Sequence, residues 1–405
     1  MKYGKLIIMN TEIEKLLKRG VEEIFPSSDF LKSRLEKGEK LKIFAGIDPT
    51  GPTLHIGHAI VLQKLKQFQD LGHEIVLLIG DFTAQIGDPT DKMATRKVLT
   101  EADIKKNMKL YKAQASHFLR FSGKNKAGIV YNSDWLKKLK LKDVIDLTSL
   151  MTVEQMMKRD MFARRTEEGK PVFIHEFLYP IMQGYDSVVL NVDVEVGGND
   201  QMFNMLVGRD FQKKLQNKEK VAITMKLLAD ANGKKMGKTE NNMVSLNDEP
   251  VDMFGKIMSW TDGMILPGYE LCTDVSDADI ESISNDLKDS SKNPRDIKLR
   301  LAKTVVARYF GEKKAEESET QFINTFKKGE IPEDIQEVVV TAGEQLSKIL
   351  VDQKIVGSVG EFKRLVGEGA VATSGGIKVE EFNFPVTQSV TMKVGKRRFI
   401  KIIVK

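Results

Sequence analysis

The sequence predicts an α/β fold built on a parallel sheet, followed by an all-helical domain and a small C-terminal α+β domain. An apolar strand-like run at 41–47, an apolar helical pattern and a second strand-like run at 74–79 predict the sheet. Residues 250–330 are charged and helical in pattern, and the segment from 341 onward has the apolar pattern of a folded domain. We therefore expect domains at 1–245, 246–332 and 341–405.

The first strand-like run ends at the turn-forming stretch 48–52, and the helical pattern follows His55-Ile56-Gly57-His58. His55 and His58 therefore lie in the first helical turn and share one face. Backbone N–H groups without an intrahelical partner and the positive end of the helix dipole lie beside them. Such a position favours phosphate, so we expect 41–82 to open a Rossmann-like, nucleotide-binding sheet.

Two other interpretations of these histidines were weighed. Histidines three apart on a helix are also a metal-ligand pattern, but no third ligand follows in a recognisable spacing, so we expect no protein-bound metal. Histidines that merely cap the helix are the second alternative. A lysine-rich segment further along the chain favours the phosphate interpretation.

This segment is Lys235-Met236-Gly237-Lys238-Thr239, and it follows a strand-like run at 221–225. Its glycines are one residue too close for a Walker-type phosphate loop, so we reject that interpretation. Mobile ammonium groups of this kind can stabilise the charge that grows on a leaving pyrophosphate. An exposed charge run is the alternative.

Together the two segments resemble the HIGH and KMSKS motifs of class I aminoacyl-tRNA synthetases. The first matches letter for letter, whereas the second has Gly237 and Thr239 in place of the two serines and keeps both lysines. The resemblance implies that ATP, with Mg²⁺ as part of the substrate complex, is attacked at its α-phosphate. It also implies that the catalytic groups are His55, His58, Lys235 and Lys238.

The stretch Tyr179 to Ser187 looks like the specificity helix of the tyrosyl-tRNA synthetases within this class. Its spacing places Tyr179, Gln183 and Asp186 on one helical face. The resemblance implies that Tyr179 and Gln183 hold the α-amino group of tyrosine and that Asp186 accepts a hydrogen bond from the phenol. An ordinary amphipathic helix with solvated polar residues is the alternative.

Further ligand-binding residues are implied by the same resemblance. Asp88, near Thr83, pairs with the substrate ammonium. The Gly-Gly segment after an expected strand at 187–196 provides Asp200 for the ribose and Gln201 for the carboxylate, although such a segment alone predicts only a loop. The expected ATP-binding set is Gly46, Asp48, Thr50, His55, His58, Gly198, Asp200, Lys235 and Lys238.

One position departs from many bacterial tyrosyl enzymes, in which a tyrosine hydroxyl at position 44 also binds the phenol. Phe44 cannot make that bond. We therefore expect rejection of phenylalanine to depend more heavily on Asp186, because only an unpaired buried polar group penalises the smaller analogue. Tryptophan is the nearest rival substrate, and Tyr185-Asp186-Ser187 looks more like the tyrosyl pattern.

The C-terminal segment carries a surplus of positive charge. Residues 341–405 contain eleven Lys and Arg against six Asp and Glu, which accounts for most of the formal charge of +6. Their pattern resembles a small RNA-binding module named after a ribosomal protein, and a basic tail that only aids solubility is the alternative. The resemblance implies RNA contacts at Lys363, Arg364, Lys396, Arg397 and Arg398.

The resemblance also implies partners and location. We expect tRNA(Tyr), L-tyrosine and ATP as partners, an anticodon-arm role for 246–332, and a homodimer with its interface near Leu147 to Met161. Cys272 is the only cysteine, which excludes an internal disulfide and favours a reducing compartment such as the cytoplasm. No apolar run is long enough to cross a membrane, so we expect no membrane association.

Two other functional classes remain open at this point. A nucleotidylyltransferase of the same superfold would share the first motif, but it would not need the polar face at 179–186 or two RNA-facing domains. A non-catalytic RNA-binding paralogue would keep the C-terminal module and lose the active-site groups. The presence of both histidines and both lysines argues against that loss.

Overall fold

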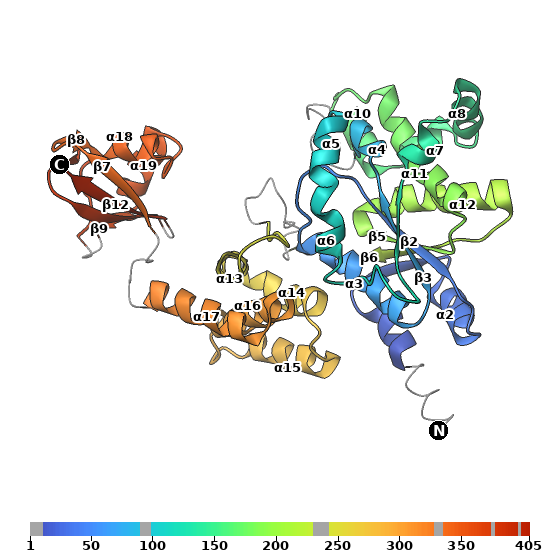
Figure 1. Ribbon diagram of the computed structural model, residues 1–405, viewed down its shortest axis with the longest axis horizontal. Coiled ribbons are helices and arrows are strands. Elements are labelled where there is room, and N and C mark those ends of the chain that lie inside the picture. The colour runs from blue at the N-terminus through green and yellow to red at the C-terminus, as the bar shows by residue number, and fades with distance from the viewer. Residues whose placement is uncertain (1–10, 90–98, 230–242, 328–334, 374–376, 396–397) are drawn as a thin grey trace. The chain divides into compact units, whose positions relative to one another are not determined.

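The computed structural model describes residues 11–89, 99–229, 243–327, 335–373, 377–395 and 398–405 (Figure 1). The chain forms two compact units, Met1–Ala315 and Glu316–Lys405. Within the described ranges, we find no helix with the length and hydropathy needed to cross a bilayer. The two units are described separately below.

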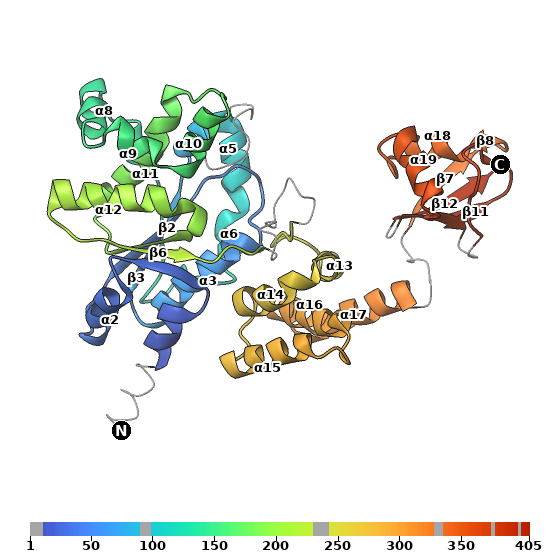
Figure 2. The ribbon, with the colours of Figure 1, turned by 180° about the vertical axis from the view of Figure 1, so that it is seen from behind.

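A six-stranded sheet forms the centre of the first unit, with strand order β1-β6-β5-β2-β3-β4. Every neighbouring pair is parallel except β1 and β6, so the predicted parallel sheet has one antiparallel edge strand. Helices pack on both faces (Figures 1 and 2). The strands are β1 (Val21–Phe25), β2 (Lys42–Ile47), β3 (Glu74–Ile79), β4 (Gly128–Tyr131), β5 (Val194–Gly198) and β6 (Val221–Met225).

The strand order reverses between β2 and β5. Strand β2 pairs with β3 along its whole length, but with β5 only at Ile43 and Phe44. Beyond that point the two strands diverge, and Gly46 is exposed although it lies in a central strand. A crevice at the carboxyl ends of parallel strands, where their order reverses, is where open α/β sheets bind ligands. The sheet thus places the ends of β2 and β5 at the expected site.

The helices of the sheet region follow the predicted alternation, with one correction. The run at 187–196, expected to be a strand, begins as the end of α11, which continues to Leu190 before Asn191 stops it at a φ of 47°. Asparagine tolerates this left-handed conformation better than most residues. The helices are 11–18, α2 (Ser28–Glu36), α3 (Ile56–Asp70), α4 (Thr83–Ile86), α5 (Glu101–Asn107), η1 (Met108–Leu110), α6 (Tyr111–Ala115), α7 (Ser133–Leu136), α8 (Leu141–Thr148), α9 (Val153–Met157), α10 (Asp160–Glu167), α11 (Ile174–Leu190), η2 (Asn199–Gln201) and α12 (Met202–Gln216).

A helical region follows the sheet. Asn293 caps α16 and Pro294 is its first residue, as predicted, since proline fits the first helical turn. Arg19 joins this region to the sheet region by donating to the carbonyl oxygens of Thr273 (2.9 Å) and Tyr269 (3.3 Å). The helices are α13 (Pro250–Met258), η4 (Asp262–Met264), α14 (Ile265–Cys272), α15 (Asp277–Lys288), α16 (Pro294–Phe310) and α17 (Glu312–Lys327).

The second unit contains a folded α+β domain, so its basic C-terminal segment is more than a solvated tail. A four-stranded sheet of order β7-β12-β11-β9 packs against two helices around buried residues such as Leu350, Phe362 and Ile400. The elements are β7 (Gln336–Val340), β8 (Glu344–Gln345), α18 (Leu346–Asp352), α19 (Val359–Gly367), β9 (Val371–Thr373), β10 (Pro385–Val386), β11 (Val390–Val394) and β12 (Arg398–Val404).

Candidate active site

The two histidines of the first motif begin α3. His55 is the N-cap, and its Nδ1 accepts a hydrogen bond from the amide of Gly57 at 3.1 Å. His58 Nδ1 accepts from the amide of His55 at 3.1 Å, and the two ring centroids are 3.9 Å apart. In a neutral ring whose Nδ1 accepts, the proton is on Nε2. The capping interpretation is thus correct as structure, and each neutral ring carries its proton on Nε2 near the N-terminus of the helix.

The chain that leaves the lysine segment pairs with the first motif. The amide of Ile56 donates to the carbonyl of Val244 at 3.0 Å, and the amide of Leu246 donates to the carbonyl of Leu54 at 2.9 Å. His55 and Ser245 form the bridge between these bonds. Segments that are far apart in the sequence therefore lie side by side. Lys235 and Lys238 themselves fall outside the described residues.

Asp48 at the end of β2 is held by two hydroxyl groups. Thr83 Oγ1 donates to Asp48 Oδ1 at 2.7 Å, and the Tyr179 hydroxyl donates to Asp48 Oδ2 at 2.9 Å. A Cβ atom on Gly80 would lie 1.9 Å from Asp48 Oδ1, so only glycine fits beneath this carboxylate. Burial, with Asp48 nearby, raises the pKa of the Tyr179 phenol, which therefore stays protonated. Its oxygen keeps lone pairs that can accept a further hydrogen bond.

Asp186 lies on α11 and is 2% exposed. The indole Nε1–H of Trp135 donates to Asp186 Oδ1 at 2.7 Å, and Asn132 Nδ2 donates to Oδ2 at 3.2 Å. Burial raises the pKa of Asp186, while these two donors oppose the rise because they stabilise the ionised form. Asn132 also donates to Thr83 Oγ1 at 3.0 Å, which connects Asp186 to the Asp48 cluster.

Asp88 and Gln201 meet on the other side of the crevice. Gln201 Nε2 donates to Asp88 Oδ2 at 2.6 Å, and Arg159 Nη2 donates to Asp88 Oδ1 at 3.0 Å. The guanidinium of Arg159 lies 5.5 Å from the ring centroids of both Phe162 and Phe203. Asp88 is thus oriented by a buried arginine before any substrate arrives.

Gln183 is bonded to a residue of β5. Its Nε2 donates to Glu195 Oε1 at 3.1 Å, and Glu195 forms an ion pair with the fully buried Lys220. Gln183 therefore lies between Tyr179 and Asp186 on α11, as expected, but its amide is hydrogen-bonded to Glu195 of strand β5.

The remaining predicted ATP residues lie at the ends of β2 and β5. The backbone amide of Thr50 donates to the carbonyl of Asp48 at 2.8 Å, and Asn107 Nδ2 donates to the carbonyl of Pro49 at 2.9 Å, which holds the turn. Asp200 is exposed, and a Cβ on Gly198 would lie 2.6 Å from its Oδ1. Gly46 and Thr50 thus lie at the carboxyl end of β2, and Gly198 and Asp200 lie at the carboxyl end of β5.

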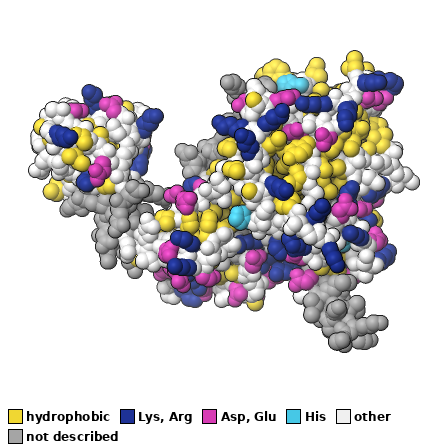
Figure 3. Space-filling model, viewed as in Figure 1, with side chains coloured by type: hydrophobic (Ala, Val, Ile, Leu, Met, Phe, Trp, Pro, Cys, Tyr) yellow, Lys and Arg dark blue, Asp and Glu magenta, His cyan; other side chains and the backbone are white. Residues whose placement is uncertain are grey.

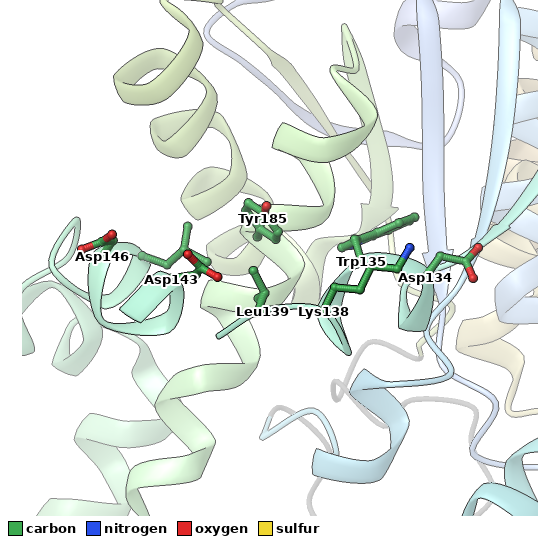
Figure 4. Close-up of a pocket in the computed structure, with 8 residues that line it drawn as sticks. Asp134, Trp135, Lys138, Leu139, Asp143, Asp146 and Tyr185 are labelled. Carbon is green, nitrogen blue, oxygen red and sulfur yellow. The ribbon is translucent and has the colours of Figure 1, made fainter. Parts of the chain in front are cut away.

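A separate surface hollow lies beside α11. It has a volume of about 500 Å³, and Trp135, Lys138 and Tyr185 are among its lining residues (Figure 4). Its lining contains none of the predicted ligand residues, so it is not the predicted site. Trp135 separates the two, because its indole N–H bonds Asp186 while its ring lines the hollow.

The predicted RNA-contact residues divide into two groups. Lys363 and Arg364 are exposed on α19, and Arg364 forms an exposed ion pair with Glu368. Arg398 is engaged within its own domain, donating to the carbonyl of Ile355 and to Glu361 Oε1. Lys396 and Arg397 lie outside the described residues.

Sequence reasoning missed five residues that hold the site. Four of them donate to, or accept from, a predicted ligand residue of a different element, and Gly80 leaves room for the Asp48 carboxylate. The residues are Gly80, Asn132, Trp135, Arg159 and Glu195. Only Glu195 gave a signal, as a charged residue inside an apolar strand pattern. Among the described residues, no group of three or more His, Cys, Asp or Glu side chains is arranged to hold a metal ion.

Comparison with known proteins identifies the family. A family model described as class I tRNA synthetases (W and Y) matches residues 36–327. A tyrosine–tRNA ligase of Carboxydothermus hydrogenoformans is 45% identical over 403 residues, covering 96% of this chain and 97% of that protein. Another, from Desulfotalea psychrophila, is 42% identical over 396 residues, covering 96% and 97%.

Solved structures share the fold. A C-terminally truncated mitochondrial tyrosyl-tRNA synthetase of Coccidioides posadasii matches with a TM-score of 0.61 and 26% identity, covering 78% of this chain and 95% of that one. The tyrosyl-tRNA synthetase of Archaeoglobus fulgidus complexed with L-tyrosine matches with a TM-score of 0.60 and 22% identity, covering 77% and 99%. The chain therefore belongs to the class I tRNA synthetases of the tryptophan and tyrosine group, and within it to the tyrosine–tRNA ligases.

Proposed function

We propose that the crevice between β2 and β5 activates L-tyrosine with ATP and passes the tyrosyl group to the 3′ end of tRNA(Tyr). The observation that carries the substrate assignment is the buried Asp186 carboxylate, held by Trp135 and Asn132. An oriented, desolvated acceptor of this kind suits a phenolic hydroxyl, because an analogue without the hydroxyl leaves the acceptor unpaired. (Selection of tyrosine over phenylalanine is a well-known instance of that general rule.)

The first step is a phosphoryl transfer. An oxygen of the tyrosine carboxylate attacks the α-phosphorus of ATP, the bond to the bridging oxygen breaks, and pyrophosphate leaves with its Mg²⁺. The protein supplies position and charge stabilisation rather than a proton acceptor. In the second step a terminal ribose hydroxyl of the tRNA attacks the acyl carbon, and AMP leaves.

Each predicted residue has a role consistent with its geometry. The α-ammonium group is bound by Asp88, by the Tyr179 oxygen and by Gln183, all of which can accept hydrogen bonds. Gln201 binds the reacting carboxylate, and Asp200 binds the ribose. The phosphates lie at the N-terminus of α3, where His55 and His58 add Nε2–H donors. Lys235 and Lys238 stabilise the pyrophosphate, and the described chain that follows them pairs with the first motif through Val244 and Ile56.

We also propose a cytoplasmic homodimer. Large apolar side chains are exposed on α8, α9 and the start of α11, and Figure 3 shows apolar side chains gathered on one face of the first unit. Leu147 and Met156, inside the segment expected to form the interface, are buried, so the exposed neighbours would make the contact. These neighbours are Leu141, Ile145, Val153, Phe173 and Ile174.

The test is exchange of labelled pyrophosphate into ATP, without tRNA, for each of the twenty amino acids. We expect exchange with tyrosine alone, and a strong reduction in Asp186→Asn, whose NH₂ group would oppose one of the two N–H donors, that of Trp135 or that of Asn132. Exchange with tryptophan would reassign the substrate. No exchange with any amino acid would favour an RNA-binding paralogue or another nucleotidyl transfer.

A further inference from the structure

A buried ion pair lies beneath the specificity helix and takes no direct part in the reaction described above. Lys220, just before β6, is 0% exposed, and Glu195 in β5 is 3% exposed. The Lys220 ammonium contacts Glu195 Oε2 and donates to Ser187 Oγ of α11 at 2.9 Å. The other carboxylate oxygen, Oε1, accepts from Gln183 Nε2 at 3.1 Å. The pair therefore joins two strands to the helix that carries Gln183.

The surrounding structure is built around the ammonium group. A Cβ atom on Gly208 of α12 would lie 2.5 Å from Lys220 Nζ and 2.6 Å from Ser187 Oγ. Helix α12 can therefore come this close to the ammonium group only with glycine at position 208. The Phe44 ring centroid lies 5.9 Å from the same nitrogen. Burial lowers the pKa of Lys220, and the contact with Glu195 opposes that effect.

Stability alone does not account for such a pair. Desolvating two charges costs about as much as their attraction returns, and apolar replacements of similar shape are often neutral or stabilising. The presence of two buried charges is therefore better explained by the group that they orient. The group they orient is the Gln183 amide, which carries an acceptor at one end and a donor at the other.

Glu195 determines which end of that amide faces the substrate. An ionised carboxylate only accepts hydrogen bonds, so it selects the NH₂ end of Gln183 and directs the carbonyl oxygen away from itself. A cationic substrate group needs that oxygen, because an NH₂ group facing an ammonium would place donor against donor. The ammonium of Lys220 contacts the other oxygen of this carboxylate.

We propose that Glu195, paired with Lys220, is a positioning residue that fixes the Gln183 amide with its carbonyl oxygen toward the α-ammonium group of the amino-acid substrate. This inference rests on the proposed function, and it concerns only the α-amino end of that substrate. The ring end of the pocket, which depends on Asp186, is unaffected by it.

The test compares two ligands that differ only in the ammonium group, L-tyrosine and 3-(4-hydroxyphenyl)propionate. Their dissociation constants are measured by titration calorimetry on the full chain and on the double variant Glu195→Gln/Lys220→Met. This variant removes both charges together at similar side-chain volume, so neither charge is left buried and unpaired. Lys298→Met/Asp262→Asn, which removes a lysine–aspartate pair of the helical region, is the control.

We expect the dissociation constant of tyrosine to rise about tenfold in the Glu195/Lys220 variant, the size of one lost charge-assisted hydrogen bond. The constant for the desamino analogue should change by less than about twofold on the same scale. The Lys298 control should leave both constants unchanged. Equal weakening of both ligands, or no change in either, would overturn the proposal, since a merely structural role cannot single out the ammonium.

A second variant keeps the test possible if the double variant does not fold. Glu195→Asp keeps both charges but withdraws the carboxylate by one methylene from Gln183, and it should raise the tyrosine constant selectively, by a smaller factor. Binding of both ligands to the unaltered chain separates a failure of the proposed function from a failure of the inference about Glu195. If the unaltered chain binds no tyrosine, the proposed function fails and this inference falls with it. If it binds tyrosine but no variant changes the ratio, only this inference fails.

Discussion

At the scale of single residues, the proposed selection of tyrosine depends on how Asp186 is surrounded. Phe44 is buried in the sheet and has no hydroxyl to offer the phenol. Asp186 is then the acceptor at the ring end, and Trp135 and Asn132 determine both its orientation and its ionisation. A substrate without the hydroxyl would leave this carboxylate desolvated and short of one donor, which is costly.

The Trp135→Phe substitution tests this role. Removing the indole N–H takes away a donor that lowers the pKa of Asp186, so that pKa rises and the ionised form is reached only at higher pH. We expect the acid limb of the pH profile of kcat/KM for tyrosine to move to higher pH. Preference for tyrosine over phenylalanine should fall about tenfold, the effect of one hydrogen bond to a charged group. Unchanged pH profiles in pyrophosphate exchange would contradict this role.

A second residue-scale prediction separates capping from catalysis at His55. Asparagine is a good N-cap and reproduces the Nδ1 acceptor, but it lacks the Nε2–H donor. His55→Asn should therefore keep the free energy of unfolding and reduce the rate of tyrosyl-adenylate formation about 100-fold. His55→Gln, whose amide reaches the Nε2 position, should recover part of that rate. Rapid-quench kinetics and urea unfolding provide the two readouts, and equal rates in the two variants would refute the assignment.

At the scale of elements, the close packing of α11 on α12 sets the position of the specificity helix. A Cβ on Gly184 of α11 would lie 2.8 Å from Val207 Cγ1 and 3.3 Å from the backbone nitrogen of Gly208. The same pair of helices encloses the Lys220 ammonium through Gly208. Any separation of α11 from α12 therefore displaces Tyr179, Gln183 and Asp186 together.

Gly184→Ala should destabilise the protein by about 1–3 kcal/mol, the usual cost of overpacking, and should raise KM for tyrosine. Gly255→Ala on α13 is the matched control, because nothing lies within 4 Å of its added Cβ. That control should be stabilising by about 0.4–1 kcal/mol, since alanine restricts the unfolded chain. Urea midpoints measure both, and a neutral Gly184→Ala would show that the helices can separate without cost.

At the scale of the whole molecule, assembly and RNA binding are assigned to different surfaces. The exposed apolar side chains lie on the first unit, and the exposed basic pair Lys363 and Arg364 lies on the second. The two surfaces can therefore be altered independently.

Ile174 tests the proposed dimer surface because its side chain is 82% exposed. Ile174→Glu places a charge where a partner would bury it, so we expect a shift from dimer to monomer in sedimentation velocity. Ile377→Glu, which charges an exposed isoleucine of the second unit, should leave the mass unchanged. Dimers in both variants would exclude this surface.

Lys363 tests the RNA surface. Lys363→Ala should weaken tRNA binding and lower the slope of log K against log salt by about one, the effect of one lost phosphate contact. Lys401→Ala, whose lysine is paired with Glu337 on the exposed face of β12, should change the slope much less. Pyrophosphate exchange should be unaffected in both, and an unaltered slope in Lys363→Ala would remove this residue from the interface.

The extent of prediction differs between fold and site. Strands β2, β3 and β6 and the cap at Asn293 were predicted from local patterns, and the structure confirms them. The prediction of a strand at 187–190 was wrong, because short apolar runs suit helix and strand equally. Here the packing of α11 on α12 favours the helix. The partners of Asp186, Asp88 and Gln183 were not predictable, since each partner comes from another element, and the charged residue Glu195 in an apolar strand did not reveal which residue it contacts.

By itself the sequence determined the family, the α/β fold class and which groups are expected to meet the substrates, because motifs and periodicity are local properties of the chain. Only the tertiary structure decided that the segment after the lysines pairs with Leu54 and Ile56, and that Trp135 and Glu195 orient Asp186 and Gln183. The physical reason is that hydrogen-bond partners of buried polar groups are chosen by distance in space, and separation along the chain carries no record of that distance.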